Sequence, residues 1–290
     1  MFPFFFIIYI FMLSIFVIYS CDRIKQFEIF YECLKEMPGY DECQKILVVD
    51  GEESNIYPND FQVILCKRPK KHFNWALAWD LGIKNSIYDK IWYLDSDRIL
   101  PTNYLKTLYE EIEEDCFVYS SQIVSMKENI ALETARKCRK DPYLYWDYYK
   151  EDWRLPNPPN MEFLSMGKNP MSGNTGFTKN TFLKSGGLDY SFEGPALADT
   201  DYYYKTYLKR FKFKTIPCLE LHLKHEYSIH ITDREYMYMY NALKVCKKYG
   251  LKPSVRLAER LKASNVDPSF MKYDIDTFML KCKNNKIKSF

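Results

Sequence analysis

The chain has 290 residues, with 41 Lys and Arg against 38 Asp and Glu and a formal net charge of +3 at pH 7, which is long enough for one large domain with a substantial core. The basic residues are spread along the sequence, without the basic, aromatic-rich run typical of nucleic-acid-binding proteins, so no nucleic-acid partner is expected. The nine cysteines are widely spaced and form no Cys-x-x-Cys pair, which argues against a zinc site or a disulfide scaffold and favours reduced thiols in a reducing compartment.

The N-terminal segment has two interpretations. Residues 1–20 are apolar almost throughout and are long enough to span a bilayer as a signal anchor. Alternatively Ile15–Tyr19 is the first strand of a sheet, because an amphipathic segment and a second apolar run follow it, and a strand of the sheet cannot also cross a membrane. We therefore expect an uncertain hydrophobic leader or anchor at 1–14, a main domain at 15–230 and a helical extension at 231–290. Cytoplasmic and membrane-associated locations both stay open.

The first half of the chain alternates between strand-like and helix-like patterns. Short β-prone runs predict strands, and amphipathic stretches between them predict helices. The expected strands are Ile15–Tyr19, Ile46–Asp50, Phe61–Cys66, Ile91–Leu94 and Phe117–Ser120, and the expected helices are Ile24–Met37, Trp75–Ile83 and Asn103–Glu114. This alternation predicts an α/β fold with a mostly parallel central sheet, helices on both faces and a ligand site at the carboxyl ends of the strands.

The second half begins with an irregular segment. Residues 140–169 are rich in proline and aromatic residues, which is typical of a lid or a binding loop. Trp153, in this loop, is a candidate for stacking against a sugar acceptor, and core packing explains it at least as well. Regular patterns then return. The expected elements are a strand at Ser172–Phe177, a helix from Thr178 to Lys184 that stops at Gly186, a helix at Asp199–Lys209, strands at Phe211–Ile216 and Leu219–Leu223, and a helix ending at Gly250.

The stretch Lys90–Pro101, KIWYLDSDRILP, carries the strongest chemical signal. Its apolar run delivers Asp95 and Asp97 to the end of a buried strand. Two carboxylates this close together suit one hard divalent cation, which can also bind phosphate oxygens of a ligand. Asp-x-Asp is also a common surface tripeptide, so the metal interpretation depends on the motifs around it.

Six motifs in this order resemble a known family. They are VIYSCDR, VVDGEES, FNWALAWDLGIKNS, IWYLDSDRILP, MSGNTGFTKNTFLKSGGLD and ALADTDYYYKTY. Together they resemble a GT-A-fold glycosyltransferase of the family 2 type, related to the catalytic domains of β-1,4-galactosyltransferases, chondroitin-polymerising enzymes and polypeptide N-acetylgalactosaminyltransferases. The resemblance extends from about Ile15 to His230. It implies the GT-A, nucleotide-diphospho-sugar transferase fold.

The resemblance implies a site for the nucleotide part of a donor. Asp50, at the end of the second strand, corresponds to the carboxylate that contacts the nucleoside, and Arg23 lies beside the same pocket. A strand-end acid also suits hydrogen bonding to a base or a ribose hydroxyl. Without the family, Asp50 before Gly51 reads equally well as a turn residue. The implied donor is a nucleotide diphosphate sugar, with UDP as the expected nucleotide.

The resemblance also implies a metal site. Asp95 and Asp97 match the Asp-x-Asp pair that binds Mn²⁺ or Mg²⁺, and the ion bridges the diphosphate of the donor. His225 matches a histidine that supplies a further ligand from a late strand, and His222 is a nearby competitor for that role. A lone histidine on a strand is more often structural than a ligand.

On the acceptor side, the resemblance assigns the catalytic base to Asp199. Asn174 and Asp201, with Trp153 from the irregular loop, are the expected acceptor-binding residues. A carboxylate can remove a hydroxyl proton when its surroundings keep its pKa from falling too low. Read without the family, Asp199 and Asp201 are first-turn acids favoured by the helix dipole.

One departure from the family pattern affects the functional interpretation. The Gly-Gly-Glu that usually precedes the catalytic acid is replaced by Ala196-Leu197-Ala198. The sequence still predicts a metal-dependent, inverting hexosyl- or N-acetylhexosaminyltransferase that acts on a hydroxyl of a glycan, a glycoprotein or another acceptor. The alternatives are a non-catalytic nucleotide-sugar-binding protein of the same fold, which the departure keeps open, and a sugar nucleotidyltransferase, which the lack of an early Gly-rich loop disfavours.

Overall fold

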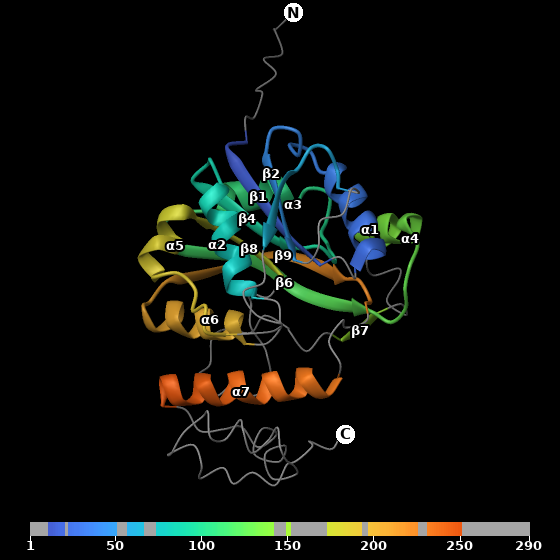
Figure 1. Ribbon diagram of the computed structural model, residues 1–290. Coiled ribbons are helices and arrows are strands. Elements are labelled where there is room, and N and C mark those ends of the chain that lie inside the picture. The colour runs from blue at the N-terminus through green and yellow to red at the C-terminus, as the bar shows by residue number, and fades with distance from the viewer. Residues whose placement is uncertain are drawn as a thin grey trace, which may run out of the picture.

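The computed structural model describes residues 11–20, 23–50, 57–66, 74–141, 149–151, 173–192, 197–225 and 231–250. Within these ranges helices and strands alternate along the first half of the chain (Figure 1). The strands are β1 (Leu13–Ser20), β2 (Gln44–Asp50), β3 (Gln62–Cys66), β4 (Lys90–Asp95), β5 (Arg98–Ile99), β6 (Cys116–Met126), β7 (Tyr149–Glu151), β8 (Asn174–Thr178) and β9 (Lys212–His222). The helices are α1 (Ile24–Lys35), α2 (Trp75–Asn85), α3 (Tyr104–Glu111), α4 (Leu132–Lys140), α5 (Lys179–Ser185), α6 (Ala198–Leu208) and α7 (Ile231–Tyr249).

The strands form one mixed sheet in the order β3-β2-β1-β4-β8-β6-β9-β5, and β7 pairs with β6. The block from β3 to β4 is parallel, as the alternation of strands and helices predicts, and β6 and β9 are also parallel to each other. β8 runs antiparallel between β4 and β6. The carboxyl ends of the parallel strands therefore share one edge of the sheet with the start of β8.

The predicted first strand is confirmed, and β1 lies inside the sheet. It pairs with β2 on one side and β4 on the other, and seven of its eight residues are buried. Its neighbours are themselves apolar strands, so both faces of β1 must be covered by helices. None of the helices in the described part of the chain is long and apolar enough to cross a membrane. Residues 1–10, most of the expected leader, lie outside the described ranges.

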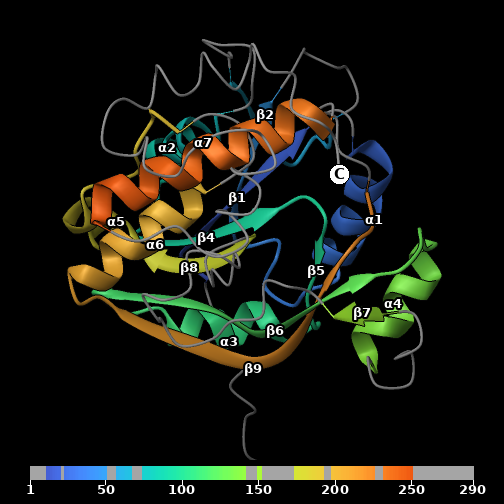
Figure 2. The same ribbon diagram turned by 90° about the horizontal axis from the view of Figure 1, so that it is seen from below.

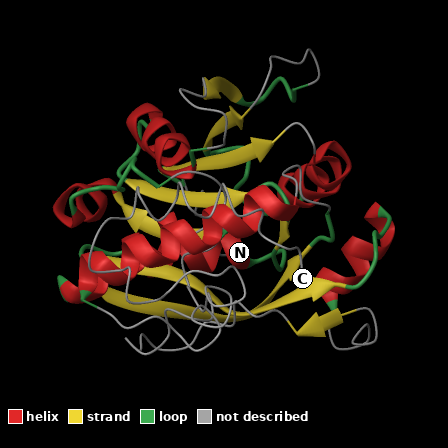
Figure 3. Cartoon of the chain, turned by 60° about the horizontal axis from the view of Figure 1, so that its bottom comes forward, coloured by secondary structure: helices red, strands yellow, loops and turns green. Residues whose placement is uncertain are grey.

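Helices cover both faces of the sheet, as predicted (Figures 2 and 3). Alternate residues of β1 divide between the two cores. Ile15 and Val17 pack with side chains of α1 and α3, whereas Phe16 and Ile18 pack with side chains of α2, α5 and α6. Gly82 of α2 permits close contact with β1, because a Cβ there would lie 2.4 Å from the Phe16 ring.

Two predicted strands, Phe211–Ile216 and Leu219–Leu223, are in fact one strand, β9. Pro217 suggests a break because proline cannot donate to a ladder. The structure accommodates it with a bulge opposite Ser121, between Ser120 and Gln122 of β6. The Ser121 hydroxyl donates to the Cys218 carbonyl oxygen at 3.2 Å and accepts from the Cys218 N–H at 3.1 Å, so a side chain replaces the missing backbone bonds.

The segment after β8 follows its predicted local signals. The Thr178 hydroxyl accepts from the Thr181 N–H and caps α5, and Gly186 ends the helix in the left-handed conformation with φ of 84°. α7 lies alongside α6 in Figures 1 and 2. The expected helices beyond Gly250, and all of the irregular segment except Lys140, Asp141 and β7, lie outside the described residues.

The seven cysteines within the described ranges are free thiols, as the sequence predicts.

Candidate metal and donor site

The turn after β4 is the structural basis of the site. β4 ends at Asp95, and a tight turn through Ser96 and Asp97 leads into the two-residue strand β5. β5 pairs antiparallel with the end of β9, so Arg98 lies opposite His222. The Leu223 N–H donates to the Asp97 carbonyl oxygen at 2.9 Å and extends this ladder. Strand pairing therefore brings Asp97 beside residues that are more than 120 positions away in sequence.

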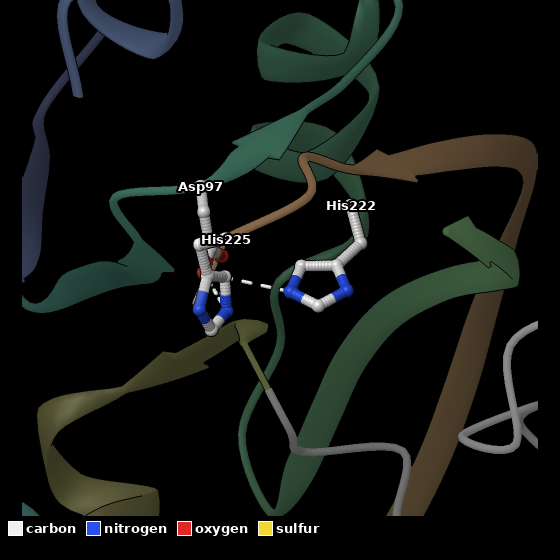
Figure 4. A group of neighbouring side chains, drawn as sticks. All are labelled: Asp97, His222 and His225. Carbon is white, nitrogen blue, oxygen red and sulfur yellow. Dashed lines mark ion pairs between the residues drawn. The ribbon is translucent and has the colours of Figure 1, made fainter. Parts of the chain in front are cut away.

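Asp97 is the centre of a buried cluster. Its side chain is 1% exposed, and Figure 4 shows His222 and His225 both directed toward it. The Oδ2 atom lies 3.2 Å from His225 Nε2, 3.5 Å from His222 Nε2 and 2.6 Å from Arg23 Nη1. One carboxylate oxygen is thus shared by three nitrogen-bearing side chains from two separate segments, the start of α1 and the end of β9.

The environment of Asp97 favours its charged form. Burial alone would raise the pKa of this carboxyl, but the charges of His222 and Arg23, together with hydrogen bonds from both histidines, hold the pKa well below its usual range. Asp97 is therefore an anion at neutral pH. An anion buried to this extent needs positive charge or a metal ion close to it.

His222 is oriented by a second contact on the far side of its ring. Its Nδ1 lies 3.1 Å from Ser125 Oγ on β6, which leaves Nε2 directed at Asp97. Metal-binding histidines in proteins are commonly held in this way through their other ring nitrogen. The ring of His225 packs edge-on against that of His222, with centroids 5.3 Å apart.

These three side chains fit a divalent cation. One oxygen of Asp97 and one nitrogen each of His222 and His225 lie within 4.8 Å of one another, so a single ion could contact all of them. Two imidazoles and one carboxylate form a donor set that suits a transition-metal ion better than Mg²⁺. Asp97 and His225 are therefore brought together as the sequence predicts. His222, which the sequence analysis gives only as a competitor, is a full member of the group.

Asp95 faces a different set of contacts. It is half-buried, and its carboxylate accepts a hydrogen bond from the Tyr93 hydroxyl. Trp75 Nε1 donates to the same hydroxyl at 2.8 Å. Burial raises the pKa of Tyr93 well above its usual value, so the hydroxyl keeps its proton and can donate it to Asp95. Asp95 is not among the residues that converge on one point with Asp97, and its metal role stays a prediction.

The two predicted nucleotide-binding residues lie at the same edge of the sheet. Asp50 ends β2 and pairs in register with Ser20 of β1. It is 2% exposed. Arg23 stands at the start of α1, and its ion pair with Asp97 places its guanidinium within the metal cluster.

The predicted acceptor residues are less accessible than the sequence suggests. Asn174 is buried, and its amide already binds Trp92, Tyr104 and Glu220. These contacts favour a structural role, and acceptor binding by Asn174 stays a prediction. Trp153 lies outside the described residues.

Asp199 and Asp201 both lie in the first turn of α6 but differ in their surroundings. Asp199 is half-buried, and its Oδ1 accepts from the Thr200 N–H at 2.8 Å. Asp201 is buried and bound to α7, through Lys248 at 2.8 Å and the Tyr249 hydroxyl at 3.0 Å. The accessible carboxylate is thus the one predicted to act as the base.

Arg98 and Glu220, which were not predicted as site residues, lie directly behind Asp97. Arg98 Nε is 3.4 Å from Asp97 Oδ1, and Arg98 Nη1 is 3.0 Å from Glu220 Oε1. A signal was present for Glu220, because strand alternation places positions 220 and 222 on the same face of β9.

Comparison with known proteins identifies the family and the fold. Residues 17–168, more than half of the chain, match the model of the family described as glycosyl transferase family 2. No curated protein sequence matches the chain. Among solved structures, the complex of GalNAc-T7 with UDP, GalNAc and Mn²⁺ is similar in fold, with a TM-score of 0.54 and 12% sequence identity. That match covers 96% of this chain and 55% of the other. The chain therefore belongs to glycosyl transferase family 2, and its fold is the GT-A fold of those enzymes.

Proposed function

We propose that the protein transfers a sugar from a nucleotide diphosphate donor, with a UDP-sugar as the expected donor, to a hydroxyl group of an acceptor. The observation that carries the proposal is the group formed by Asp97, His222 and His225 at the carboxyl edge of the parallel strands. Family 2 membership supports the reaction class. The GalNAc-T7 complex contains UDP and Mn²⁺, so these are the first donor nucleotide and ion to test. That protein is similar to this chain in fold alone, so its ligands are a starting point for the experiment.

Asp97, His222 and His225 would hold the divalent ion, for which Mn²⁺ is the expected identity and Mg²⁺ the alternative. When bound, the ion supplies Lewis-acid stabilisation of the negative charge on the departing diphosphate. Arg23 is well placed to add to that stabilisation, because its guanidinium reaches the same carboxylate oxygen. Asp50 would bind the nucleoside at the neighbouring strand end, and Asp95 would orient the donor beside the ion.

Asp199 would be the general base. As the acceptor oxygen attacks the anomeric carbon, its proton passes to the Asp199 carboxylate, and the bond between that carbon and the diphosphate oxygen breaks with its electron pair leaving on the nucleoside diphosphate. A single displacement of this kind inverts the anomeric configuration. Inversion is the expected outcome because a single displacement needs a base, and Asp199 at the start of α6 is the residue that we assign to that role.

The first experiment measures the release of nucleoside diphosphate from a panel of nucleotide sugars, with Mn²⁺, with Mg²⁺ and with a chelator. Release that needs the ion and disappears in Asp97→Asn supports the proposal. Asp60→Asn is a matched control, because Asp60 accepts hydrogen bonds from Tyr31 and Tyr40 away from the site. Absence of both turnover and metal-dependent nucleotide binding across the panel would refute the glycosyltransferase proposal.

A second experiment separates catalysis from binding. The alternative of a non-catalytic nucleotide-sugar-binding protein is kept open by Ala198, which stands where the family has an acidic residue. If Asp199 is the base, Asp199→Asn abolishes transfer and preserves donor binding. A protein that only binds would show no turnover in either form. The anomeric coupling in the NMR spectrum of the product then decides between inversion and retention.

A further inference from the structure

A second polar group lies behind the metal cluster, and the proposed chemistry does not use it. Arg98 and Glu220 both have fully buried side chains, and they form an ion pair at 3.0 Å. On its other side, Arg98 lies 3.4 Å from Oδ1 of Asp97. The two oxygens of Asp97 therefore have different surroundings, because Oδ1 faces Arg98 whereas Oδ2 faces the histidines and Arg23.

Glu220 is held in turn by side chains from neighbouring strands. Its Oε2 accepts from the Ser120 hydroxyl on β6 and from Asn174 Nδ2 on β8 at 2.9 Å. Asn174 is itself fixed, because Trp92 Nε1 on β4 donates to its Oδ1 at 2.7 Å and its Nδ2 lies 3.0 Å from the Tyr104 hydroxyl. The network connects Asp97 to five strands of the sheet, β4, β5, β6, β8 and β9, so the position of Arg98 is determined from several directions.

Gly173 allows this arrangement. A Cβ at position 173 would lie 2.6 to 2.7 Å from the Arg98 guanidinium, and the residue has φ of +94°, which glycine adopts without strain. Its carbonyl oxygen accepts from the Asp95 N–H at 2.8 Å. The same glycine therefore admits the side chain behind Asp97 and fixes the backbone at Asp95.

Stability alone does not account for a buried ion pair at this place. Removing two charges from water is costly, and well-packed apolar residues of similar volume often stabilise a fold as well or better. What the guanidinium adds is a buried positive charge with two nitrogens, each in ion-pair contact with a different carboxylate. Here the two carboxylates are Glu220 and the central residue of the metal cluster.

We propose that Arg98, held by Glu220 and Asn174, is a positioning residue for metal binding: it fixes the Asp97 carboxylate so that Oδ2 is presented to the ion together with His222 and His225. This inference rests on the proposed function, since it needs the ion. It gives Asn174 a role behind the metal site in place of acceptor binding. Outer-sphere contacts of this kind change metal affinity by about 10- to 100-fold.

The test replaces the pair by apolar residues, Arg98→Met with Glu220→Leu, which leaves the net charge of the site unchanged. Mn²⁺ affinity is measured without nucleotide, by calorimetry and by the spectroscopic signal of free Mn²⁺. We expect binding to weaken by about 10- to 100-fold while the thermal unfolding transition stays cooperative. If the protein is active, the Mn²⁺ concentration for half-maximal activity rises in parallel, and the rate at saturating Mn²⁺ changes by less than about threefold, because the ligands themselves remain.

Arg139→Met is the matched control. Arg139 has a 1% exposed side chain and binds the carbonyl oxygens of Cys33 and Leu100 and the carboxylate of Glu36, away from Asp97. Its loss should lower stability without changing Mn²⁺ affinity. Should the double variant not fold, Arg98→Lys carries the test. Lysine keeps the charge but has one ammonium in place of the two nitrogens that contact Asp97 and Glu220, so a smaller loss of Mn²⁺ affinity is expected.

The outcomes separate the two proposals. Unchanged Mn²⁺ affinity in a folded variant, alongside loss of binding in Asp97→Asn, overturns the positioning role and leaves the metal site intact. No Mn²⁺ binding by the unaltered protein overturns the metal site and the positioning role together. An equal loss of affinity in Arg139→Met would show that general destabilisation is responsible, and would also overturn the inference.

Discussion

The metal centre and the start of α6 supply two halves of one proposed reaction, and they are built differently. The metal centre is held by strand pairing, with Asp97 fixed between β5 and β9 and surrounded by Arg23, Arg98 and the two histidines. The start of α6 is held by a helix, since α7 binds Asp201 through Lys248 and Tyr249. Asp199, the proposed base, is half-exposed beside this contact.

This difference indicates that the metal centre, more than the start of α6, is fixed before substrate binds. A buried charge network leaves its members few alternative positions, whereas a first-turn acid of a helix depends on the packing of that helix. Leu197, just before α6, has φ of 68°, a strained conformation for a residue that is not glycine. We therefore expect changes at the metal centre to abolish activity, and changes at the α6 and α7 contact to affect mainly stability.

The largest effect is expected for Asp97→Asn. The variant keeps the size of the side chain but removes the charge shared by Arg23, His222 and His225. A bound metal ion contributes several kcal/mol to stabilising a transition state, which corresponds to a loss of transfer of roughly 1,000-fold. Steady-state nucleotide release measures the loss. Activity within tenfold of the unaltered protein would place the ion elsewhere.

The next largest effect is expected for Asp199, and it can be compared with Asp201 in the same turn of α6. Asp199→Asn should lower the rate of transfer by about 100-fold or more while donor binding is preserved, because general bases typically contribute this much. Asp201→Asn is the matched control on the same helix and should lower stability more than activity, since Asp201 is buried against α7. Equal losses of activity in the two variants would contradict the assignment of the base.

A smaller effect is expected for Ser125→Ala, which removes the hydroxyl 3.1 Å from His222 Nδ1. The ring of His222 would lose one constraint, and Mn²⁺ affinity should fall by about tenfold. Calorimetric titration with Mn²⁺ measures the change. Ser121→Ala, on the same strand but bound to Cys218 at the bulge, should leave Mn²⁺ affinity unaltered.

The same two regions show what the sequence could and could not predict. Asp97 was predictable because the apolar run before it indicates a buried strand that ends at this point. His225 was predictable because it matches a histidine of the family motifs. The participation of His222 depends on the pairing of β5 with β9, and a two-residue strand leaves almost no pattern in a sequence. Arg98 reads as an ordinary surface arginine after a turn. Only the three-dimensional arrangement shows that it is fully buried.

The predicted α/β fold was recovered well in the first half, where periodic apolar residues form β1 to β4 with α1 and α2. It was recovered less well around β9, because a proline that normally ends a strand is accommodated there by the Ser121 hydroxyl. The short helix α4 was missed, because most of its side chains are polar or charged and only three of its nine residues are buried. The local sequence pattern therefore predicts secondary structure well where buried residues recur regularly. It predicts secondary structure poorly where a single side-chain contact determines whether a strand continues.

The smallest effect concerns the contact between α7 and the segment before α6. Lys248 lies 3.0 Å from Asp189 as well as 2.8 Å from Asp201. Burial opposes the charge on Asp189, but hydrogen bonds from Ser191 and the contact with Lys248 lower its pKa to about 2. The pKa of Asp189 in the folded protein is below that of an Asp in the unfolded chain, about 3.9. The stabilisation is therefore complete above about pH 3.9 and is lost as the pH falls through 2.

Asp189→Asn should therefore lower the free energy of unfolding at pH 7 by at most about 1 kcal/mol, as for a partly exposed ion pair. The difference from the unaltered protein should disappear near pH 2. Denaturant unfolding at a series of pH values measures it, with Asp115→Asn as the control for a surface carboxylate paired to Lys184. A difference that persists unchanged at low pH would mean that packing of the Asp189 side chain, and not its charge, holds this segment against α7.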